Sequence, residues 1–318
     1  MKKTMTKTGK KTWSRKFVIG FKKNWQRHLM MLLPLIYIIL FEYWPMYGLQ
    51  IAFRDYTARG GITGSVWVGL EHFREFFANY KWPIYVKNTL RISLYSLIVG
   101  FPIPVFLALM LHVNETKWLR KLTQNMSYVP HFISTVVMVG ILWQILDPFN
   151  GIFATFARLT GWKLFQMDLR VNPDAFIHVY VWSGIWQNMG WDTIIYVSAL
   201  SSVSEELHEA ARLDGASRWK RILHVDLPAI MPTVCIMLIM RCGSIMGVGH
   251  EKVYLMQNAM NMDVSEVIST YVYKYGLANN QLSYGTAVGL MNSAVNTTLL
   301  LFVNWITKKL SDDEVGLY

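Results

Sequence analysis

The sequence lacks several features on which enzymes and secreted domains rely. Its only two cysteines, Cys235 and Cys242, lie seven positions apart in one apolar stretch, so they provide no disulfide framework. The phosphate-loop pattern G-x-x-x-x-G-K-[S/T] is absent, because Gly9-Lys10 is followed by another lysine and has no upstream glycine. This chain alone therefore cannot hydrolyse ATP.

Motifs of hydrolytic enzymes are also missing. His208-Glu209 and His250-Glu251 begin like the helix of a zinc protease, but Arg212 and Tyr254 stand where the second histidine is needed. No G-x-S-x-G nucleophile motif occurs. We therefore expect no catalytic residue, no metal site and no cofactor in this chain.

Apolar residues are abundant instead, at 53% of the chain, and they cluster in long runs. A helix needs about 20 such residues to cross the hydrocarbon layer of a bilayer. The runs do not alternate with polar residues as the strands of a membrane barrel would. The pattern predicts an all-α integral membrane protein with six transmembrane helices, near residues 29–53, 88–112, 126–146, 176–200, 229–249 and 286–307.

Positive charge is distributed unevenly along the chain. Residues 1–28 hold ten lysines and arginines and no acidic residue, which by the positive-inside rule places both termini in the cytoplasm. The net charge of +11 is then explained mostly by topology and contact with anionic lipid, rather than by nucleic acid. No small-residue cleavage site follows the first apolar run, where Glu42 to Pro45 stand.

No low-complexity linker divides the chain. We expect a basic cytoplasmic tail over residues 1–28 and one transmembrane domain over residues 29–318.

Residues 204–228 form a polar segment between spans four and five. Glu205, Glu206 and Glu209 favour a helix start, where the helix dipole stabilises negative charge. Gly215 can adopt the left-handed conformation that ends a helix, and a second short helix is predicted over residues 217–224. The segment is thus a helix-turn-helix on the cytoplasmic side. An amphipathic helix lying on the lipid surface would explain the same pattern.

The same segment resembles a family motif. The pattern E-A-A, three residues, G, nine residues, I-x-L-P marks the membrane subunits of bacterial ABC importers, and this chain departs from it only at Val225, where isoleucine is usual. The stretches PMYGLQIAFRDY (residues 45–56) and VGLEHF (68–73) are similar to the polysaccharide and oligosaccharide group of the maltose-type permeases. The resemblance extends over most of the chain.

The resemblance implies a permease in the bacterial plasma membrane that carries oligosaccharides or polysaccharide fragments into the cell. It implies a second permease, generally a different chain, two ATPase subunits that bind ATP and magnesium, and an extracellular solute-binding protein. Residues 204–228 would be the coupling segment, which docks on the ATPase. The matched residues are Glu209, Ala210, Ala211, Asp214, Gly215, Leu227 and Pro228.

Candidate substrate-pathway residues lie in spans four to six. A charged side chain such as Arg241 costs free energy in a membrane, so Arg241 is a functional candidate. A structural role, in which the arginine bonds to carbonyls of neighbouring helices, explains its presence equally well. Tryptophans beside amides suit a sugar, but also an interfacial aromatic belt. Paired asparagines in span six can line a path or hold helices together. The candidates are Trp186, Asn188, Trp191, Arg241, Met246, Gly249, His250, Asn292 and Asn296.

A secondary transporter driven by an ion gradient is the main alternative. Such a protein would bury carboxylates near the middle of the membrane. Glu42 and Asp192 are the main candidates, and we expect both to lie toward the outer ends of their spans.

Overall fold

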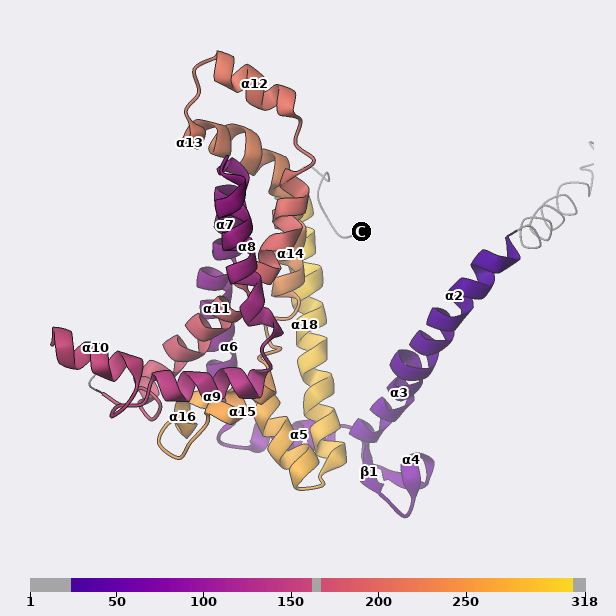
Figure 1. The fold of residues 1–318 in the computed structure, drawn as a ribbon. Coiled ribbons are helices and arrows are strands. Elements are labelled where there is room, and N and C mark those ends of the chain that lie inside the picture. Colours follow the sequence, from indigo (N-terminus) through magenta and orange to yellow (C-terminus); the bar gives the residue numbers. More distant parts are fainter. Residues whose placement is uncertain (1–23, 162–166, 311–318) are drawn as a thin grey trace, which may run out of the picture.

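The computed structural model describes residues 24–161 and 167–310, and it is predominantly helical (Figure 1). Most of the basic tail predicted from the sequence, residues 1–23, lies outside the described residues, as do residues 311–318. The helices of nine or more residues are α2 (Trp25–Ile38), α6 (Trp82–Gly100), α7 (Pro102–Val113), α8 (Lys117–Tyr128), α9 (Thr135–Ile145), α10 (Ile152–Thr160), α11 (Pro173–Leu200), α12 (Glu205–Leu213), α14 (Leu227–Cys242) and α18 (Leu282–Leu310).

Shorter elements join these helices. The short α-helices are α3 (Trp44–Met46), α4 (Gly61–Gly64), α5 (Glu71–Ala78), α13 (Arg218–Arg221), α15 (His250–Met256), α16 (Met262–Ser265) and α17 (Ile268–Tyr271). π-Helical turns cover Ile39–Tyr43, Ile222–Asp226 and Val272–Ala278, and 3₁₀ turns cover Tyr47–Phe53 and Val129–Phe132.

A small hairpin corrects the expectation of a purely helical chain. Strands β1 (Arg54–Thr57) and β2 (Ser65–Trp67) pair antiparallel, with Arg54 opposite Trp67. The connection is rich in glycine, and Gly61 has a φ of +60°. Glycine disfavours helix and readily adopts positive φ, so this stretch turns back on itself.

Four helical stretches in the described residues are long and apolar enough to cross a membrane, namely Trp25–Phe53, Trp82–Val113, Arg218–Cys242 and Leu282–Lys309. Helix α11 has 28 residues, about 42 Å at the usual rise per residue. Its polar side chains, including Gln187, Asn188 and Asp192, make it less apolar than these four stretches.

The predicted third span, residues 126–146, is not one straight helix. Lys117–Phe132 and Thr135–Ile145 meet at an angle of 106°. Pro130 lies in the 3₁₀ turn before the bend, and Ser134 caps the new helix by accepting a hydrogen bond from the Val137 amide. Proline and a helix cap in succession redirect the chain here.

The predicted fifth span begins earlier than expected. Residues 217–224 do not form a separate short helix, because α13 continues through a π-helical turn into α14 as one helical stretch, Arg218–Cys242. Pro228 lies inside this continuous stretch, two residues after the π-helical turn Ile222–Asp226, and a local π turn is one way in which a membrane helix accommodates the missing amide hydrogen of proline.

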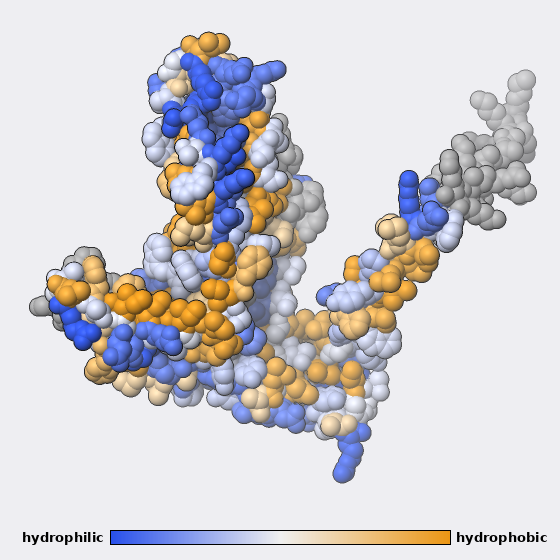
Figure 2. All heavy atoms as spheres, in the orientation of Figure 1, coloured by the Kyte–Doolittle hydropathy of each residue, from blue (hydrophilic) through white to orange (hydrophobic). Residues whose placement is uncertain are grey.

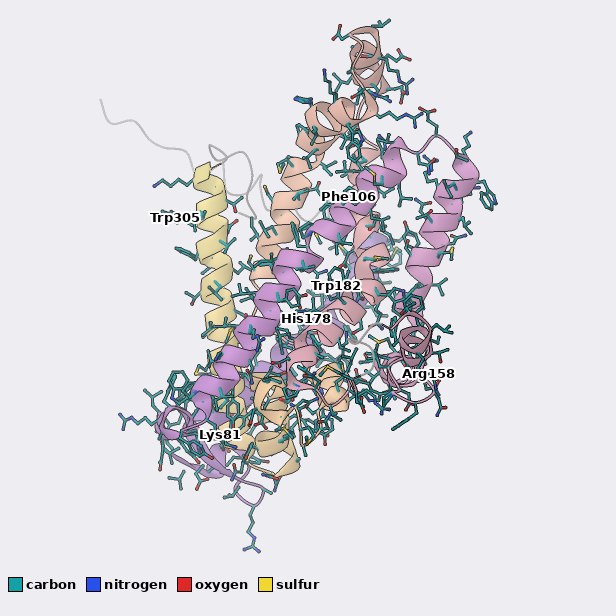
Figure 3. All side chains as sticks on the ribbon, turned by 90° about the vertical axis from the view of Figure 1, so that its left-hand side faces the viewer. Lys81, Phe106, Arg158, His178, Trp182 and Trp305 are labelled. Carbon is teal, nitrogen blue, oxygen red and sulfur yellow. The ribbon has the colours of Figure 1, made fainter. Side chains whose placement is uncertain are left out.

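The helices form an elongated bundle with two different ends (Figure 1). Helix α12 covers one end, where hydrophilic residues gather in Figure 2, and α9, α10, α15 and α16 lie at the other. Figure 3 shows Lys81 and Arg158 at that second end, and Trp305 on α18 toward the α12 end. Helix α2 extends away from the bundle and has no buried residue.

Helix α11 lies at the centre, in contact with α6, α7, α8 and α14. Its closest approach to α8 is at Gly190, where a Cβ atom would collide with the backbone carbonyl of Ser127. Small residues let membrane helices approach closely, which is the main source of their packing energy.

We predict that Gly190→Ala lowers the apparent Tm of the purified protein in detergent. The added methyl meets backbone, which cannot move aside cheaply, so the expected cost is about 3 kcal/mol. Gly140→Ala on α9 is the matched control, because a Cβ there has no neighbour within 4 Å. Equal Tm values for both variants would contradict the packing described here.

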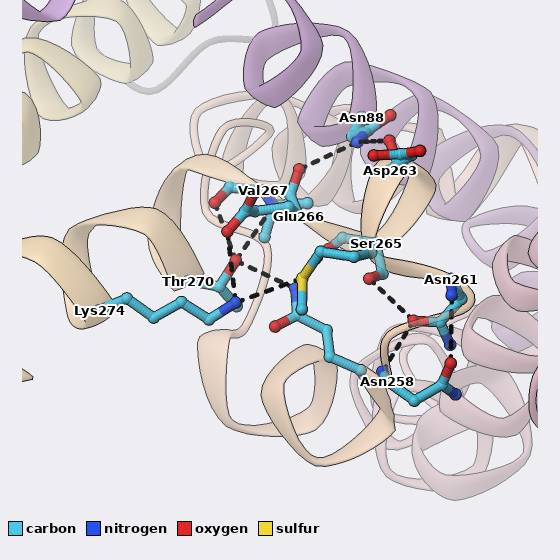
Figure 4. A network of polar contacts seen from close by, with 11 residues as sticks. Asn88, Asn258, Asn261, Asp263, Ser265, Glu266, Val267, Thr270 and Lys274 are labelled. Carbon is cyan, nitrogen blue, oxygen red and sulfur yellow. Dashed lines mark hydrogen bonds and ion pairs between the residues drawn. The ribbon is translucent and has the colours of Figure 1, made fainter. Parts of the chain in front are cut away.

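A polar network fixes the loop before α18 at the end opposite α12 (Figure 4). The Asn88 side chain on α6 donates to the carbonyls of Asp263 and Glu266 at 2.8 and 3.0 Å. Lys274 lies 3.3 Å from the Glu266 carboxylate. Because Asn88 is 5% exposed, these bonds satisfy a buried amide and anchor the loop rigidly to α6.

Candidate functional site

The predicted coupling segment, residues 204–228, begins with a well-capped helix. The Ser204 hydroxyl accepts a hydrogen bond from the Glu206 amide at 3.2 Å, and Glu205 and Glu206 occupy the first turn of α12. Cap and charge both stabilise a helix N-terminus. The sequence prediction of a helix start at this point is confirmed.

The helix ends at Gly215, which has a φ of +73°. The Gly215 amide donates to Arg212 at 3.0 Å, and the Ala216 amide donates to Ala211 at 2.9 Å. These two bonds form a Schellman motif, which depends on a left-handed residue and therefore favours glycine. The predicted left-handed Gly215 is confirmed.

The residues of the coupling motif are largely accessible. Glu209, Ala210, Asp214, Gly215 and Pro228 are exposed, while Ala211 and Leu227 are half-buried. Large apolar side chains lie exposed beside them, namely Leu207, Leu213, Trp219 and Leu223, with Leu213 at 90%. Exposed apolar groups within a polar surface are typical of a site that binds another protein.

A central cavity of about 300 Å³ lies between α6, α7, α11 and the segment that joins α14 to α15. Its polar lining includes Gln187, Asn188, Asp192, Arg241 and Lys252. Ser93, Ser96 and Ser244 add hydroxyl groups, so the cavity offers many hydrogen-bonding groups beside its apolar side chains.

Arg241 and Asp192 form an ion pair in this cavity. The pair neutralises two charges that would each be costly in a membrane. Asp192 lies eight residues before Leu200, the end of α11 nearest α12. Its expected position toward the outer end of the span stays a prediction.

Lys252 is the cavity residue that sequence reasoning missed. Its ammonium donates to the Tyr180 carbonyl at 2.8 Å and lies 4.7 Å from the centre of the Tyr180 ring. Burial lowers the pKa of Lys252 to about 7, because the charged form loses its hydration. Lys252 lies in a loop helix outside every apolar run, so no periodicity singled it out.

The other predicted pathway residues are divided among several places. Asn188 and Gly249 line the central cavity with Arg241. Trp186 lines a separate apolar groove of about 800 Å³ between α9 and α11. His178 and Trp182, which Figure 3 labels, line the same groove. Trp191 instead stacks on His131, with ring centres 4.4 Å apart.

The asparagines of α18 contact backbone rather than the cavity. Asn296 accepts a hydrogen bond from the Met246 amide at 2.9 Å, and Asn292 donates to the Met246 carbonyl at 3.3 Å. Met246 is buried. The two asparagines therefore hold the non-helical turn after α14 against α18.

His250 is exposed and stacks on Tyr273, with ring centres 5.6 Å apart.

Comparison with known proteins agrees with this architecture. Residues 81–312 match the model of the binding-protein-dependent transport system inner membrane component. A polygalacturonan/rhamnogalacturonan transport system permease protein of Bacillus subtilis is 37% identical over 309 residues, covering 97% of this chain and 95% of that protein. An arabinooligosaccharides transport system permease protein of the same organism is 30% identical, covering 72% and 71%.

A solved structure is similar over nearly the whole chain. It is a bacterial alginate ABC transporter in complex with an alginate pentasaccharide-bound periplasmic protein, and the chain matched there gives a TM-score of 0.84 at 34% identity. The match covers 94% of this chain and 98% of that one. The chain has this fold, the E-A-A motif with its spacing intact, and several helices able to cross a membrane. It belongs to the family of binding-protein-dependent transport system inner membrane components, the permease subunits of ABC importers.

Proposed function

We propose that this permease imports acidic oligosaccharides, and that Lys252 in the central cavity recognises their carboxylates. Alginate and polygalacturonan, named in two of the similar proteins, are chains of uronic acids. Carboxylates that enter a low-dielectric cavity need a compensating cation. The Asp192–Arg241 pair already cancels its own charge, so Lys252 is the cation in the cavity that lacks a carboxylate partner among the described residues.

The proposed topology has six spans, with both termini and α12 in the cytoplasm. Support comes from the basic start of the chain and from the direction of the helices in Figure 1, where α2 begins and α18 ends toward the α12 end. Four of the six spans qualify by length and composition. The bent pair of helices, Lys117–Phe132 and Thr135–Ile145, would be the fifth span, and α11 would be the sixth.

The proposed partner at α12 is a pair of ATPase subunits, which would bind ATP and magnesium. The exposed side chains of Leu207, Leu213 and Trp219 offer the apolar contacts, and the Schellman turn at Gly215 keeps them in one orientation. ATP-driven closure can drive the permease only if the ATP-bound ATPase binds one permease conformation better than the other.

A second permease and an extracellular binding protein complete the proposed assembly. Helix α2 has no buried residue, and its exposed apolar side chains suit either lipid or another membrane helix. The apolar groove at Trp182 and Trp186 offers a further contact surface. The loops at the α15–α16 end would face the binding protein.

The proposal predicts a pH dependence. The Lys252 ammonium is charged below its pKa of about 7 and neutral above it, so uptake of a uronic-acid oligosaccharide should fall as pH rises from 6 to 8. A neutral oligosaccharide of the same length should show no such fall. Initial uptake rates in proteoliposomes, with the internal pH held constant, measure the difference.

Reconstitution tests the whole proposal. The permease, copurified with its membrane and ATPase partners, is placed in liposomes with the binding protein outside and ATP inside. We expect ATP-dependent uptake of uronic-acid oligosaccharides. Uptake by this chain alone that follows a proton or sodium gradient would overturn the importer assignment, and equal uptake of neutral oligosaccharides would overturn the acidic substrate.

A further inference from the structure

Three ligand-type side chains meet behind the coupling helix. His112 lies at the end of α7, His208 lies in the middle of α12, and Asp226 closes the π-helical turn before α14. One nitrogen of each imidazole and one oxygen of the carboxylate lie within 4.8 Å of one another. Three segments far apart in sequence thus bring two imidazoles and a carboxylate to one point.

The cluster is buried and its polar atoms lack hydrogen bonds. Asp226 is 0% exposed and His208 is 7% exposed. Among the residues that the structure describes, neither the two carboxylate oxygens of Asp226 nor the Nε2 of His208 has a hydrogen-bond partner. Leu109, three residues before His112, and Ile230, four residues after Asp226, belong to an apolar core cluster. A buried carboxylate in this state is costly unless a cation binds it.

The distances fit a small metal ion. His208 Nε2 lies 3.3 Å and His112 Nε2 lies 3.6 Å from the same oxygen, Asp226 Oδ1. Zinc bonds of about 2.0–2.1 Å in tetrahedral geometry place neighbouring ligand atoms about 3.3–3.4 Å apart. The two distances to Asp226 Oδ1 are thus close to those of a zinc site, while the two imidazole nitrogens, which lie within 4.8 Å of each other, would have to approach to about 3.4 Å if they are farther apart.

The donor set selects the ion. Two neutral imidazoles and one carboxylate suit zinc and related divalent transition metals, whereas calcium and magnesium prefer oxygen ligands. Water would supply the fourth ligand, since the imidazole of His112 is still 26% exposed. The other charged groups that act on the cluster are Arg120, Glu205 and Arg221.

We propose that His112, His208 and Asp226 form a zinc-binding site that fastens the coupling helix α12 to the ends of α7 and α14. His208 is the one buried residue of α12, so this site is where the helix is tied to the bundle. A metal bond at this point converts a movement of α12 directly into a movement of two spans. This proposal departs from the expectation of no metal site, which followed from sequence spacing alone.

Metal analysis of the purified assembly tests the proposal. After incubation with Zn²⁺ and removal of free metal, the wild-type protein should retain about one zinc per chain, held by the three side chains and one water. His208→Phe should retain none, while His208→Cys should retain it, because a thiolate is also a zinc ligand. Co²⁺ in place of Zn²⁺ should give the visible absorption of a tetrahedral site.

His224→Ala is the matched control. His224 belongs to the same coupling segment, but it is exposed and only contacts the Lys220 carbonyl, so its loss should not change the zinc content. The proposal is overturned if the wild-type protein retains no zinc, or if His224→Ala lowers the zinc content as much as His208→Phe. The wild-type measurement remains decisive even if a variant fails to fold.

Discussion

Gly215→Pro is expected to abolish ATP-driven uptake while leaving the protein inserted in the membrane. Proline holds φ near −65°, whereas Gly215 has a φ of +73°. Proline also lacks the amide hydrogen that Gly215 donates to Arg212. The Schellman turn cannot form with either change, so α12 loses its fixed orientation toward the ATPase.

Two measurements check this expectation. Uptake by the reconstituted importer should fall to background, and the ATPase subunits should no longer copurify with the permease. Gly215→Asn is the control, because asparagine tolerates the left-handed conformation better than other non-glycine residues, and it should keep most of the uptake. Unchanged transport by Gly215→Pro would count against the coupling role of this turn.

Lys252→Met should lower uptake of acidic oligosaccharides about tenfold or more. A hydrogen bond to a charged group contributes about 1.5–3 kcal/mol, and 1.4 kcal/mol corresponds to a factor of ten. Methionine fills a similar volume without charge, so uptake of neutral oligosaccharides should remain. The variant should also lose the decline of uptake between pH 6 and 8.

Lys87→Met provides a matched control for this variant. Lys87 lies on α6, is exposed, and does not line the cavity. Its replacement should leave the preference for acidic substrates unchanged. If Lys252→Met transports acidic and neutral oligosaccharides in the wild-type ratio, the cation of the cavity does not select the substrate, although the chain would remain an importer subunit.

Local signals in the sequence were sufficient for the coupling segment. A capping serine, acidic residues in the first turn and a glycine at the end define α12 without any information from distant residues. The bend between Phe132 and Thr135 was missed, because an apolar run has the same composition whether it is straight or folded back. The hairpin at residues 54–67 was missed for a related reason, since its strands are very short.

Sites built from distant residues were harder to predict. His112, His208 and Asp226 are separated by 96 and 18 positions, and only the fold brings α7, α12 and the π-helical turn Ile222–Asp226 together at this point. Lys252 is likewise defined by the cavity that surrounds it. The asparagines of α18 were found from their spacing, but that spacing could not tell backbone contacts from a substrate path.

The isolated position of α2 has a consequence for the cell. A subunit made in excess of the proposed second permease would carry α2 without a neighbouring helix to hold it in place, and segments with few buried contacts have a low local stability. We therefore expect the abundance of this chain to be set by the supply of its proposed partner. Pulse labelling in cells that lack the proposed second permease should show its half-life shortened.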